Sequence, residues 1–455
     1  MPYARKVISV IGLARSGFAA AKLLLREGAR VFVSDSADNE ELRSRRDILV
    51  KMGAEVELGG HTARVYCGAD EIILSPGIPP DIPILLKVAE KYPDLPIISE
   101  IELGFRFARG QIIAITGSNG KSTTTSLTGE LLKSAGIPVS VCGNIGKPFC
   151  EAVLESEPGT VFSLELSSFQ LEQIESLRPE VACLLNLSPD HLDRYDSPED
   201  YYAAKMNIFE NQIENDMAVL SALDERVRSM AEEVPGRVRY FGAWVGLAEA
   251  VYPRNGWIVS DIGGPVQEIV QIKDLGIRGE HNLSNACAAL ACVLRFTRDI
   301  DSLSSALKSF SGLPHRLELI AKIGGVEYIN DSKATNVDAL ECALRSFDSG
   351  VILIAGGYDK GADFEPLAEL VSSVTRKVIL IGDTAERIAS DWNGAAEIEP
   401  AESLEEAVKI ASQIAQSGDV VLLAPGCASF DMFENFEKRG EAFAKIVHKL
   451  EKGEG

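Results

Sequence analysis

The stretch "AITGSNGKST", residues 114–123, joins an apolar run to a polar segment that favours a helix. A strand, a glycine loop and a helix in this order present backbone N–H groups to phosphate oxygens. We expect Lys121 to reach the β- and γ-phosphates and the hydroxyl of Ser122 or Thr123 to hold Mg²⁺. The alternative is a Gly-Asn turn that only caps a helix, but Lys-Ser-Thr directly at the helix start argues against it. The stretch therefore predicts a nucleotide-binding loop.

The loop departs from the common P-loop pattern, which places four residues between its glycines. Only Ser118 and Asn119 separate Gly117 from Gly120, and Ile115 stands where the first glycine of that pattern belongs. This spacing indicates a variant family rather than a common ATPase.

Apolar strand runs alternate with helical patterns along the whole chain, which is typical of α/β proteins. We predict three α/β domains, each with a mainly parallel sheet, over residues 1–99, 100–312 and 313–455. Ligands in such sheets bind beyond the carboxyl ends of the strands. Polar clusters follow the strand runs at those ends.

Composition excludes several classes of protein. The 455 residues carry a net charge of −22 and are 46% apolar, which argues against a general nucleic-acid binder and against docking on an anionic membrane. The N-terminus runs directly into a strand, without the layout of a signal peptide, and no apolar run has the length of a membrane span. The eight cysteines form no C-x-x-C pair. A reducing cytoplasm is the expected location.

Three residues further along the chain, Glu165, His191 and Lys205, are candidates for the metal site. Glu165 ends a strand and is expected to share Mg²⁺ with Ser122. His191 follows another strand end among aspartates, and Lys205 lies two turns into the helix that begins near Ser197. A surface glutamate, a structural histidine and a solvated lysine are the alternatives.

Later motifs place further polar residues at helix entrances and strand ends. "GEHNLSN" carries Asn282, "GLPHRLE" carries Arg316, which can grip a phosphoryl group, and "YINDSKATN" carries Asp331. An N-cap cluster, a surface arginine and a plain turn are the respective alternatives.

The first glycine loop has a weak dinucleotide fingerprint. Ala14 replaces the glycine that lets a pyrophosphate approach, although Gly12, Gly17 and the acidic Asp35 are present. NAD chemistry is therefore disfavoured, and a degenerate version that binds another nucleotide fits better.

Together these motifs resemble the Mur ligase family, nearly end to end and most weakly over about the first hundred residues. The motifs, in family order, are "TGSNGKST", "ELSSFQLE", "NLSPDHLDRY", "GEHNLSN", "GLPHRLE", "NDSKATN", "GGYDKGADF" and "CASFDMFENFEKRG". "DSKATN" and "NFEKRG" resemble the members that add D-glutamate. The resemblance implies a Rossmann-like UDP-substrate domain, a central P-loop-type ATPase domain and a Rossmann-like amino-acid domain.

The resemblance also implies the reaction. ATP phosphorylates the carboxylate of UDP-N-acetylmuramoyl-L-alanine, and the amine of D-glutamate displaces phosphate from the acyl phosphate. The cofactors implied are ATP and Mg²⁺, with Lys205 as an N-carboxylated (carbamate) metal ligand and His191 on a second Mg²⁺. The protein is expected to be a cytoplasmic monomer without nucleic-acid or membrane partners.

The remaining site residues follow from matching positions. The implied ATP contacts are Gly117, Ser118, Asn119, Gly120, Lys121, Ser122, Thr123, Asn282, Arg316 and Asp331. The implied substrate contacts are Ser16, Asp35, Ser36, Gly77 and Asn144 for the UDP-linked substrate, and Lys333, Thr335, Lys360, Ser429 and Phe436 for D-glutamate. Arg15 and Ala37 stand where the family often differs, which leaves uracil recognition open. A ligase similar to folylpolyglutamate synthetase and a non-enzymatic nucleotide-binding module are the alternative functions.

Overall fold

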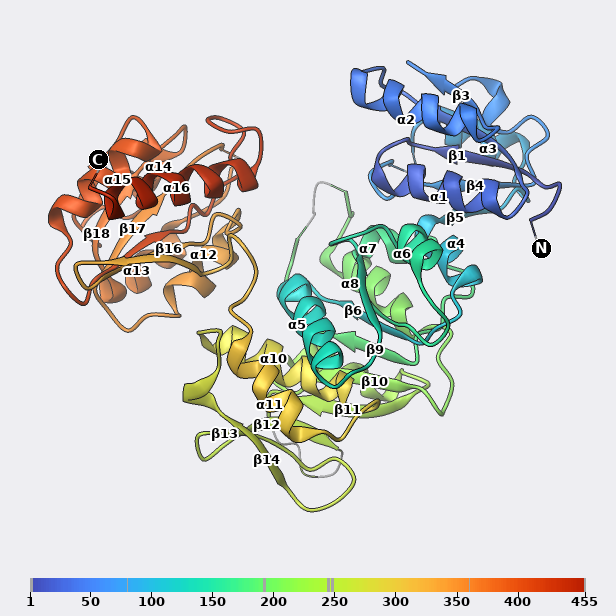
Figure 1. Ribbon diagram of the computed structural model, residues 1–455. Helices are drawn as coiled ribbons and strands as arrows, with labels where there is room; N and C mark the ends of the chain where they lie inside the picture. Colours follow the sequence, from blue (N-terminus) through green and yellow to red (C-terminus); the bar gives the residue numbers. More distant parts are fainter. Residues whose placement is uncertain are drawn as a thin grey trace. The chain divides into compact units, whose positions relative to one another are not determined.

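The computed structural model describes residues 3–79, 81–190, 194–243, 246, 249–359 and 361–453. The chain forms two compact units, the first made of Met1–Lys273 with Asn285–Leu307, and the second of Asp274–Ser284 with Lys308–Gly455 (Figure 1). Unit 1 contains two sheets and unit 2 contains the third. The predicted α/β fold with three parallel-rich sheets is confirmed.

The first sheet has the strand order of a Rossmann fold, β3-β2-β1-β4-β5, and all its strands are parallel. Its strands are β1 Val7–Ile11, β2 Arg30–Asp35, β3 Glu55–Leu58, β4 Glu71–Leu74 and β5 Ile97–Ser99. Its helices are α1 Arg15–Arg26, α2 Glu40–Lys51, α3 Pro83–Lys91 and α4 Glu100–Phe107. Apolar side chains of α1 and α2 pack on one face of the sheet and those of α3 on the other.

The second sheet holds the nucleotide loop and has the order β14-β13-β12-β11-β10-β9-β6-β8-β7. Its strands are β6 Ile112–Thr116, β7 Val139–Gly143, β8 Val161–Glu165, β9 Val181–Leu184, β10 Met217–Ser221, β11 Arg237–Phe241, β12 Ala250–Arg254, β13 Trp257–Ser260 and β14 Gln267–Gln271. The sheet is parallel from β7 to β12, and β13 and β14 continue it as antiparallel strands. Sequence analysis did not foresee this antiparallel extension.

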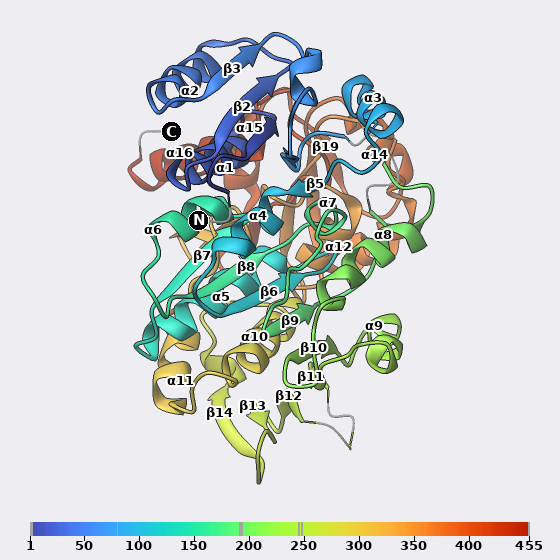
Figure 2. The same ribbon diagram turned by 90° about the vertical axis from the view of Figure 1, so that its right-hand side faces the viewer.

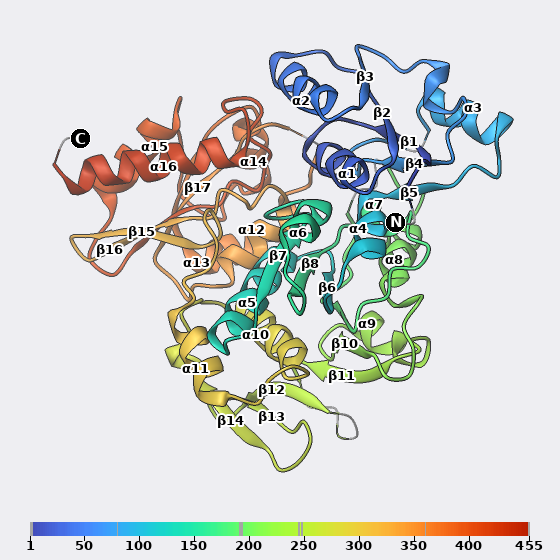
Figure 3. The same cartoon turned by 45° about the vertical axis from the view of Figure 1, so that its right-hand side comes forward.

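Seven helices accompany the second sheet. They are α5 Lys121–Ser134, α6 Phe149–Glu155, α7 Ser168–Leu171, α8 Pro198–Met206, α9 Glu225–Ser229, α10 Glu280–Val293 and α11 Ile300–Ser309. Helices α5 and α10 lie side by side, and the Thr124 hydroxyl donates to Asn285 Oδ1 at 3.3 Å (Figure 3). Helix α6 packs against α1 and α4 of the first sheet (Figure 2).

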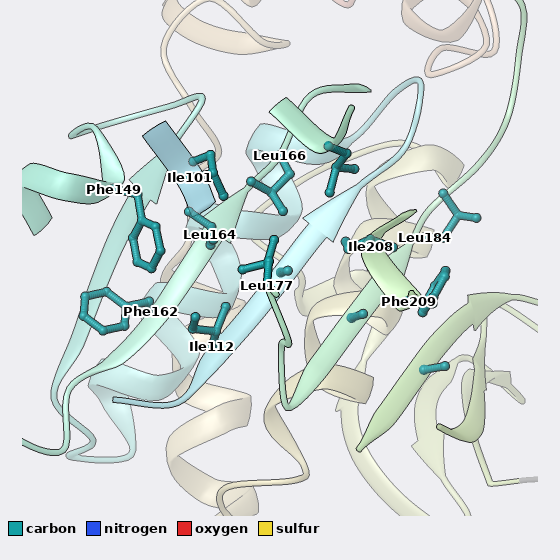
Figure 4. Close-up of a cluster of buried hydrophobic side chains, with 14 of the residues drawn as sticks. Ile101, Ile112, Phe149, Phe162, Leu164, Leu166, Leu177, Leu184, Ile208 and Phe209 are labelled. Carbon is teal, nitrogen blue, oxygen red and sulfur yellow. The ribbon is translucent and has the colours of Figure 1, made fainter. Parts of the chain in front are cut away.

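A buried apolar cluster fills the face of the second sheet opposite α5 (Figure 4). Phe149 from α6 meets Phe162 from β8 edge to face, with ring centroids 5.3 Å apart. Ile112 and Leu164 come from the two strands that end at the nucleotide loop and at Glu165. The packing of this cluster against β6 and β8 therefore fixes the ends of these strands, which carry the predicted site.

The third sheet has the order β15-β16-β20-β17-β18-β19 and is parallel except for the β15–β16 pair. Its strands are β15 Glu318–Ile323, β16 Val326–Asn330, β17 Val351–Ala355, β18 Thr375–Leu380, β19 Ile398–Pro400 and β20 Val420–Leu423. Its helices are α12 Val337–Leu344, α13 Ala368–Val374, α14 Ala385–Asp391, α15 Leu404–Ile414 and α16 Phe436–Glu451. Helices α12, α13 and α14 cover one face, and α15 and α16 cover the other.

Among the residues that the structure describes, no helix combines the length and the apolar character needed to cross a bilayer.

Candidate active site

The glycine loop joins β6 to α5 and depends on its two glycines. Gly117 has a φ of 149°, and Gly120, which precedes the first residue of α5, has a φ of 82°. A Cβ on Gly120 would lie 2.3 Å from Asn285 Oδ1, and a Cβ on Gly117 would lie 2.9 Å from Leu185 Cβ. Neither position therefore tolerates a side chain without a shift of its neighbours.

The segment after β9 fixes the loop in place. Asn186 accepts from the Ser118 backbone N–H at 3.0 Å through its carbonyl and from the Asn119 N–H at 2.8 Å through its side chain. The Ser118 hydroxyl donates to the carbonyl of Ser188 at 2.9 Å. Sequence analysis did not assign Asn186 or Ser188, although both stand in the quoted motif "NLSPDH". Their hydrogen bonds hold the loop in shape.

Lys121 is the first residue of α5, and its side chain folds back onto the glycine loop. Its ammonium donates to the carbonyls of Gly117 and Ser118, each at 2.8 Å. Ser122 and Thr123 are buried in the first turn of the helix. The loop thus collects a cation, hydroxyls and a helix N-terminus, which together suit a polyphosphate.

Glu165 ends β8 in the same sheet, one strand away from the loop. Its side chain is 1% exposed, and its Oε1 accepts from Asn144 Nδ2 at 2.8 Å. Its Oε2 is buried and has no hydrogen-bond partner among the residues that the structure describes. A buried carboxylate oxygen without a donor is costly unless a cation neutralises it. Glu165 and the Ser122 hydroxyl therefore fit a hard divalent cation such as Mg²⁺.

Lys205 lies on α8, which Ser197 caps as predicted by accepting from the Asp200 N–H. Its side chain is 1% exposed, and its Nζ donates to the Gly117 carbonyl at 2.9 Å. Burial, helped by the nearby Lys121 charge and opposed by Asp190 and Glu165, lowers the pKa of Lys205 to about 6. Lys205 is therefore a mainly neutral amine at neutral pH, and it contacts the nucleotide loop directly.

The described part of the chain holds only some of the predicted metal ligands. No group of three or more His, Cys, Asp and Glu side chains converges there as a metal site. His191, predicted to hold a second Mg²⁺, lies outside the described residues.

Three predicted nucleotide contacts, Asn282, Arg316 and Asp331, belong to unit 2, whereas the loop belongs to unit 1. Asp331, at the end of β16, accepts from the Leu317 N–H at 3.2 Å. Burial raises the pKa of Asp331 to about 7, and the Leu317 N–H and the Arg316 charge oppose the rise. Asn282 is buried on α10, where its Nδ2 donates to the Arg278 carbonyl at 2.8 Å.

His281, beside Asn282, is held as a neutral imidazole. Burial lowers its pKa to about 4, and the Arg316 charge contributes. Arg316, Asp331 and His281 thus form one electrostatic group in unit 2.

The predicted amino-acid contacts lie on two loops and a helix of unit 2. Lys333 and Thr335 follow β16, Ser429 follows β20, and Phe436 begins α16. The Lys333 ammonium lies 3.8 Å from the centroid of the Phe436 ring. Lys360, the fifth predicted contact, lies outside the described residues.

Arg439, which sequence analysis did not assign, joins these loops. Its buried guanidinium donates to Ser332 Oγ at 3.0 Å and to the carbonyls of Ser332, Cys427 and Ala428 at 2.9, 3.0 and 3.2 Å. Burial lowers its pKa to about 10, so it remains a cation at neutral pH. Arg439 stands in the quoted "NFEKRG", and its hydrogen bonds link the loop that carries Lys333 and Thr335 to the loop that carries Ser429.

The predicted UDP-substrate contacts lie at the carboxyl ends of the first and second sheets. Ser16 is in the first turn of α1, and Gly77 is in the exposed turn after β4. Asp35, at the end of β2, accepts from the Leu13 N–H at 2.6 Å and from the Ala37 N–H at 2.9 Å. The exposed Ser36 follows it.

The exposed Asn144 follows β7 in the second sheet, and its hydrogen bond to Glu165 joins a predicted substrate contact to a predicted metal ligand. Arg15, beside Ser16, donates to the carbonyl of Gly146 in the loop after β7.

Three family models match the sequence. They are the Mur ligase MurD-like N-terminal domain over residues 6–97, the Mur ligase middle domain over 115–293 and the Mur ligase glutamate ligase domain over 315–427. The chain belongs to the Mur ligase family. This Mur ligase is 43% identical to the UDP-N-acetylmuramoylalanine–D-glutamate ligase of Geotalea uraniireducens (strain Rf4) over 100% of both chains. It is also 43% identical to the ligase of the same name from Koribacter versatilis (strain Ellin345), over 98% of each chain.

Solved structures of other Mur ligases share the fold at low identity. The UDP-N-acetylmuramate-alanine ligase of Thermotoga maritima matches with a TM-score of 0.59 and 20% identity over 98% of this chain and 99% of that chain. A D-alanyl-D-alanyl-adding ligase from Acinetobacter baumannii matches with a TM-score of 0.61 and 16% identity, over 97% and 93% respectively. These matches concern the fold alone.

Proposed function

We propose that this Mur ligase joins D-glutamate to UDP-N-acetylmuramoyl-L-alanine with cleavage of ATP to ADP, a step of peptidoglycan precursor synthesis. The observation that carries the proposal is the end-to-end similarity to ligases named for this D-glutamate addition, at 43% identity. The alternatives, a folate-type ligase and a binding module, lack such support.

The reaction needs ATP because a carboxylate oxygen is a poor leaving group. Transfer of the γ-phosphoryl group to the L-alanyl carboxylate forms an acyl phosphate and ADP. The amine of D-glutamate then attacks the acyl carbon, and the tetrahedral intermediate loses a proton and expels inorganic phosphate. The protein's contribution is mostly positioning and charge stabilisation. We assign the phosphate-positioning role to the loop Gly117–Lys121 and to Arg316.

We assign one Mg²⁺ to Ser122 and Glu165, a second Mg²⁺ to His191, and the role of a carbamate metal ligand to Lys205. Mg²⁺, when bound, supplies positive charge that offsets the negative charge of the phosphoryl oxygens. The neutral Lys205 amine can attack CO₂, lose one proton and become an N-carboxylate. That change replaces a buried amine with two oxygen ligands of the kind that Mg²⁺ prefers. The buried Oε2 of Glu165 supports this assignment.

We assign D-glutamate to Lys333, Thr335, Lys360, Ser429 and Phe436. Lys360 is assigned as the cation for one carboxylate, Lys333 as a further substrate contact, and the hydroxyls of Thr335 and Ser429 as donors. Arg439 holds their loops together through four hydrogen bonds. We place the UDP-substrate, ATP and amino-acid domains at residues 1–99, 100–312 and 313–455. The monomeric state and the cytoplasmic location stay predictions.

The proposal is tested by ADP release with UDP-N-acetylmuramoyl-L-alanine and ATP in the presence of D-glutamate, L-glutamate or L-lysine. Of the three amino acids, we expect only D-glutamate to support turnover. In L-glutamate the α-carbon is inverted, so its amine points away from the acyl phosphate when both carboxylates stay bound. Turnover with L-glutamate and a folate acceptor would favour the folate-type ligase. No ADP release with any pair would favour the binding module.

A further inference from the structure

Helix α1 of the first sheet holds one segment of the second sheet at both of its ends. At the first residue of the helix, Arg15 Nη2 donates to the carbonyl of Gly146, in the loop after β7 (residues 144–147). At the last residue, Arg26 Nη1 donates to the Leu154 carbonyl of α6 at 3.1 Å. The helix also packs against α6 (Figure 2). The loop after β7 and α6 are therefore tied to the position of α1.

The loop after β7 is closed on itself and on the neighbouring strand. The Gly143 N–H donates to the Lys147 carbonyl at 2.8 Å, and the Asn144 N–H donates to the Glu165 carbonyl at 3.0 Å. Gly143 and Gly146 have φ values of 101° and 64°, which favour glycine. A Cβ on Gly143 would lie 2.3 Å from the carbonyl oxygen of Glu165. The loop therefore has little freedom to change shape, and a shift at one of its ends reaches the other.

Asn144 connects this loop to a predicted metal ligand. Its Nδ2 donates to Glu165 Oε1 at 2.8 Å, whereas Oε2 of the same carboxylate is buried and has no hydrogen-bond partner within the described ranges. Asn144 thus contacts both the backbone carbonyl and the side chain of Glu165. A displacement of the loop changes the direction in which Oε2 points. The contacts run from Arg15, through the loop, to Glu165.

Arg15 also stands beside an assigned substrate contact. It precedes Ser16 in the first turn of α1, and the N-terminus of a helix attracts phosphate. A guanidinium has five N–H donors, so the bond to Gly146 leaves others for a diphosphate. The Arg15 side chain is exposed, and fixing a long side chain costs conformational entropy. A diphosphate that orders Arg15 therefore lowers the cost of its bond to Gly146.

We propose that Arg15 is a positioning residue that couples binding of the UDP-linked substrate to binding of Mg²⁺ at Glu165. The substrate fixes Arg15, Arg15 fixes the loop after β7, and the loop fixes the carboxylate of Glu165. Coupling between two ligands is reciprocal, so the cation tightens binding of the substrate by the same factor. The inference rests on the proposed function, since it takes the UDP-linked substrate and Mg²⁺ from it.

The test measures cation binding directly, with Mn²⁺ as the probe in place of Mg²⁺. Electron paramagnetic resonance gives the free Mn²⁺ over the full chain, with and without UDP-N-acetylmuramoyl-L-alanine and in the absence of nucleotide. Glu165→Gln identifies the Mn²⁺ that belongs to this site. In the wild-type protein we expect the substrate to tighten Mn²⁺ binding about 3- to 10-fold, a range set by the ordering of one arginine side chain. In Arg15→Met this factor should fall below about 2.

Two further variants separate coupling from packing. Arg15→Lys keeps a cation that can donate to Gly146 and should retain most of the coupling factor. Arg26→Met is the matched control, because it removes the same kind of bond at the other end of α1, and it should leave the factor unchanged. Hydrogen exchange gives a readout without metal. The substrate should slow exchange in the peptide that contains Asn144 in the wild-type protein and in Arg26→Met, but not in Arg15→Met.

A coupling factor in Arg15→Met equal to that of the wild-type protein, or an equal loss in Arg26→Met, would overturn the role of Arg15. A wild-type factor near 1 would overturn it as well. These results leave the proposed function intact as long as the wild-type protein releases ADP with D-glutamate. Failure of that reaction would instead refute the proposed function.

Discussion

Lys205 gives the most quantitative test of the site. At about pH 7.5 the amine is mainly neutral in the folded protein, where its pKa is about 6, and charged in the unfolded chain, where the pKa is near 10.5. Each pKa unit is worth about 1.4 kcal/mol, so holding this amine neutral costs roughly 4 kcal/mol of unfolding free energy at that pH. Lys205→Met keeps the length of the side chain and removes this cost.

The substitution also removes one hydrogen bond, to the carbonyl of Gly117. A typical hydrogen bond contributes about 1 kcal/mol, and this carbonyl still accepts from Lys121. We therefore expect Lys205→Met to be more stable than the wild-type protein by about 2–3 kcal/mol at about pH 7.5. Ligase activity should be lost, because methionine cannot form a carbamate.

The stability gain should depend on pH in one direction. Above the unfolded-state pKa near 10.5 the lysine is neutral in both states, and the gain vanishes. As the pH falls from there toward about 6, the unfolded chain takes up the proton first, and the gain grows. Below about 6 both states are protonated, and the gain stays constant.

Urea unfolding in CO₂-depleted buffer, read by hydrogen exchange in peptides of β6, β8 and β9, measures the effect. Lys133→Met, at an exposed lysine of α5, is the matched control and should lie within about 0.5 kcal/mol of the wild-type protein. A destabilised Lys205→Met, or a gain that does not change with pH, would refute the buried neutral amine.

Three further substitutions test the nucleotide and metal assignments. Lys121→Ala should reduce ADP release to background while the circular dichroism spectrum stays that of the wild-type protein, because it removes the cation that we assign to the β- and γ-phosphates. Normal turnover would contradict the phosphate-loop assignment. Glu165→Gln keeps an oxygen for Asn144 but removes the negative charge, so the Mg²⁺ concentration at half-maximal activity should rise about tenfold or more; an unchanged Mg²⁺ dependence would place the cation elsewhere. The wild-type protein should bind ATP more tightly as the pH rises through about 7, where Asp331 loses its proton and becomes a better acceptor for ribose hydroxyls. Calorimetry should show that Asp331→Asn abolishes this slope, and an identical slope would remove Asp331 from the ribose contact.

Much of the fold follows from local patterns in the sequence. The apolar run Ile112–Thr116, the glycines and the Lys-Ser-Thr helix start predict a strand, a loop and a helix, and the structure has β6 and α5 there. Ser197 and Pro198 predict the start of α8 in the same way. The antiparallel strands β13 and β14 escaped prediction, because short strands at the edge of a sheet have little periodicity of their own.

The sequence by itself determined which chemical groups are present and their order along the chain. The motifs around Lys121, Glu165 and Asp331 also place these groups at or after the carboxyl ends of strands, which is where ligands bind in parallel sheets. This local order was sufficient to predict the α/β architecture and the family.

Only the tertiary structure decided how these groups behave. The low pKa of Lys205, the unpartnered oxygen of Glu165 and the four hydrogen bonds of Arg439 all arise from burial by segments distant in the chain. The cluster around the buried Ser34 hydroxyl likewise depends on Glu57, Gly60 and His61 meeting in space. Desolvation and hydrogen-bond geometry depend on every atom packed around a group, and no pattern of neighbouring letters contains that information.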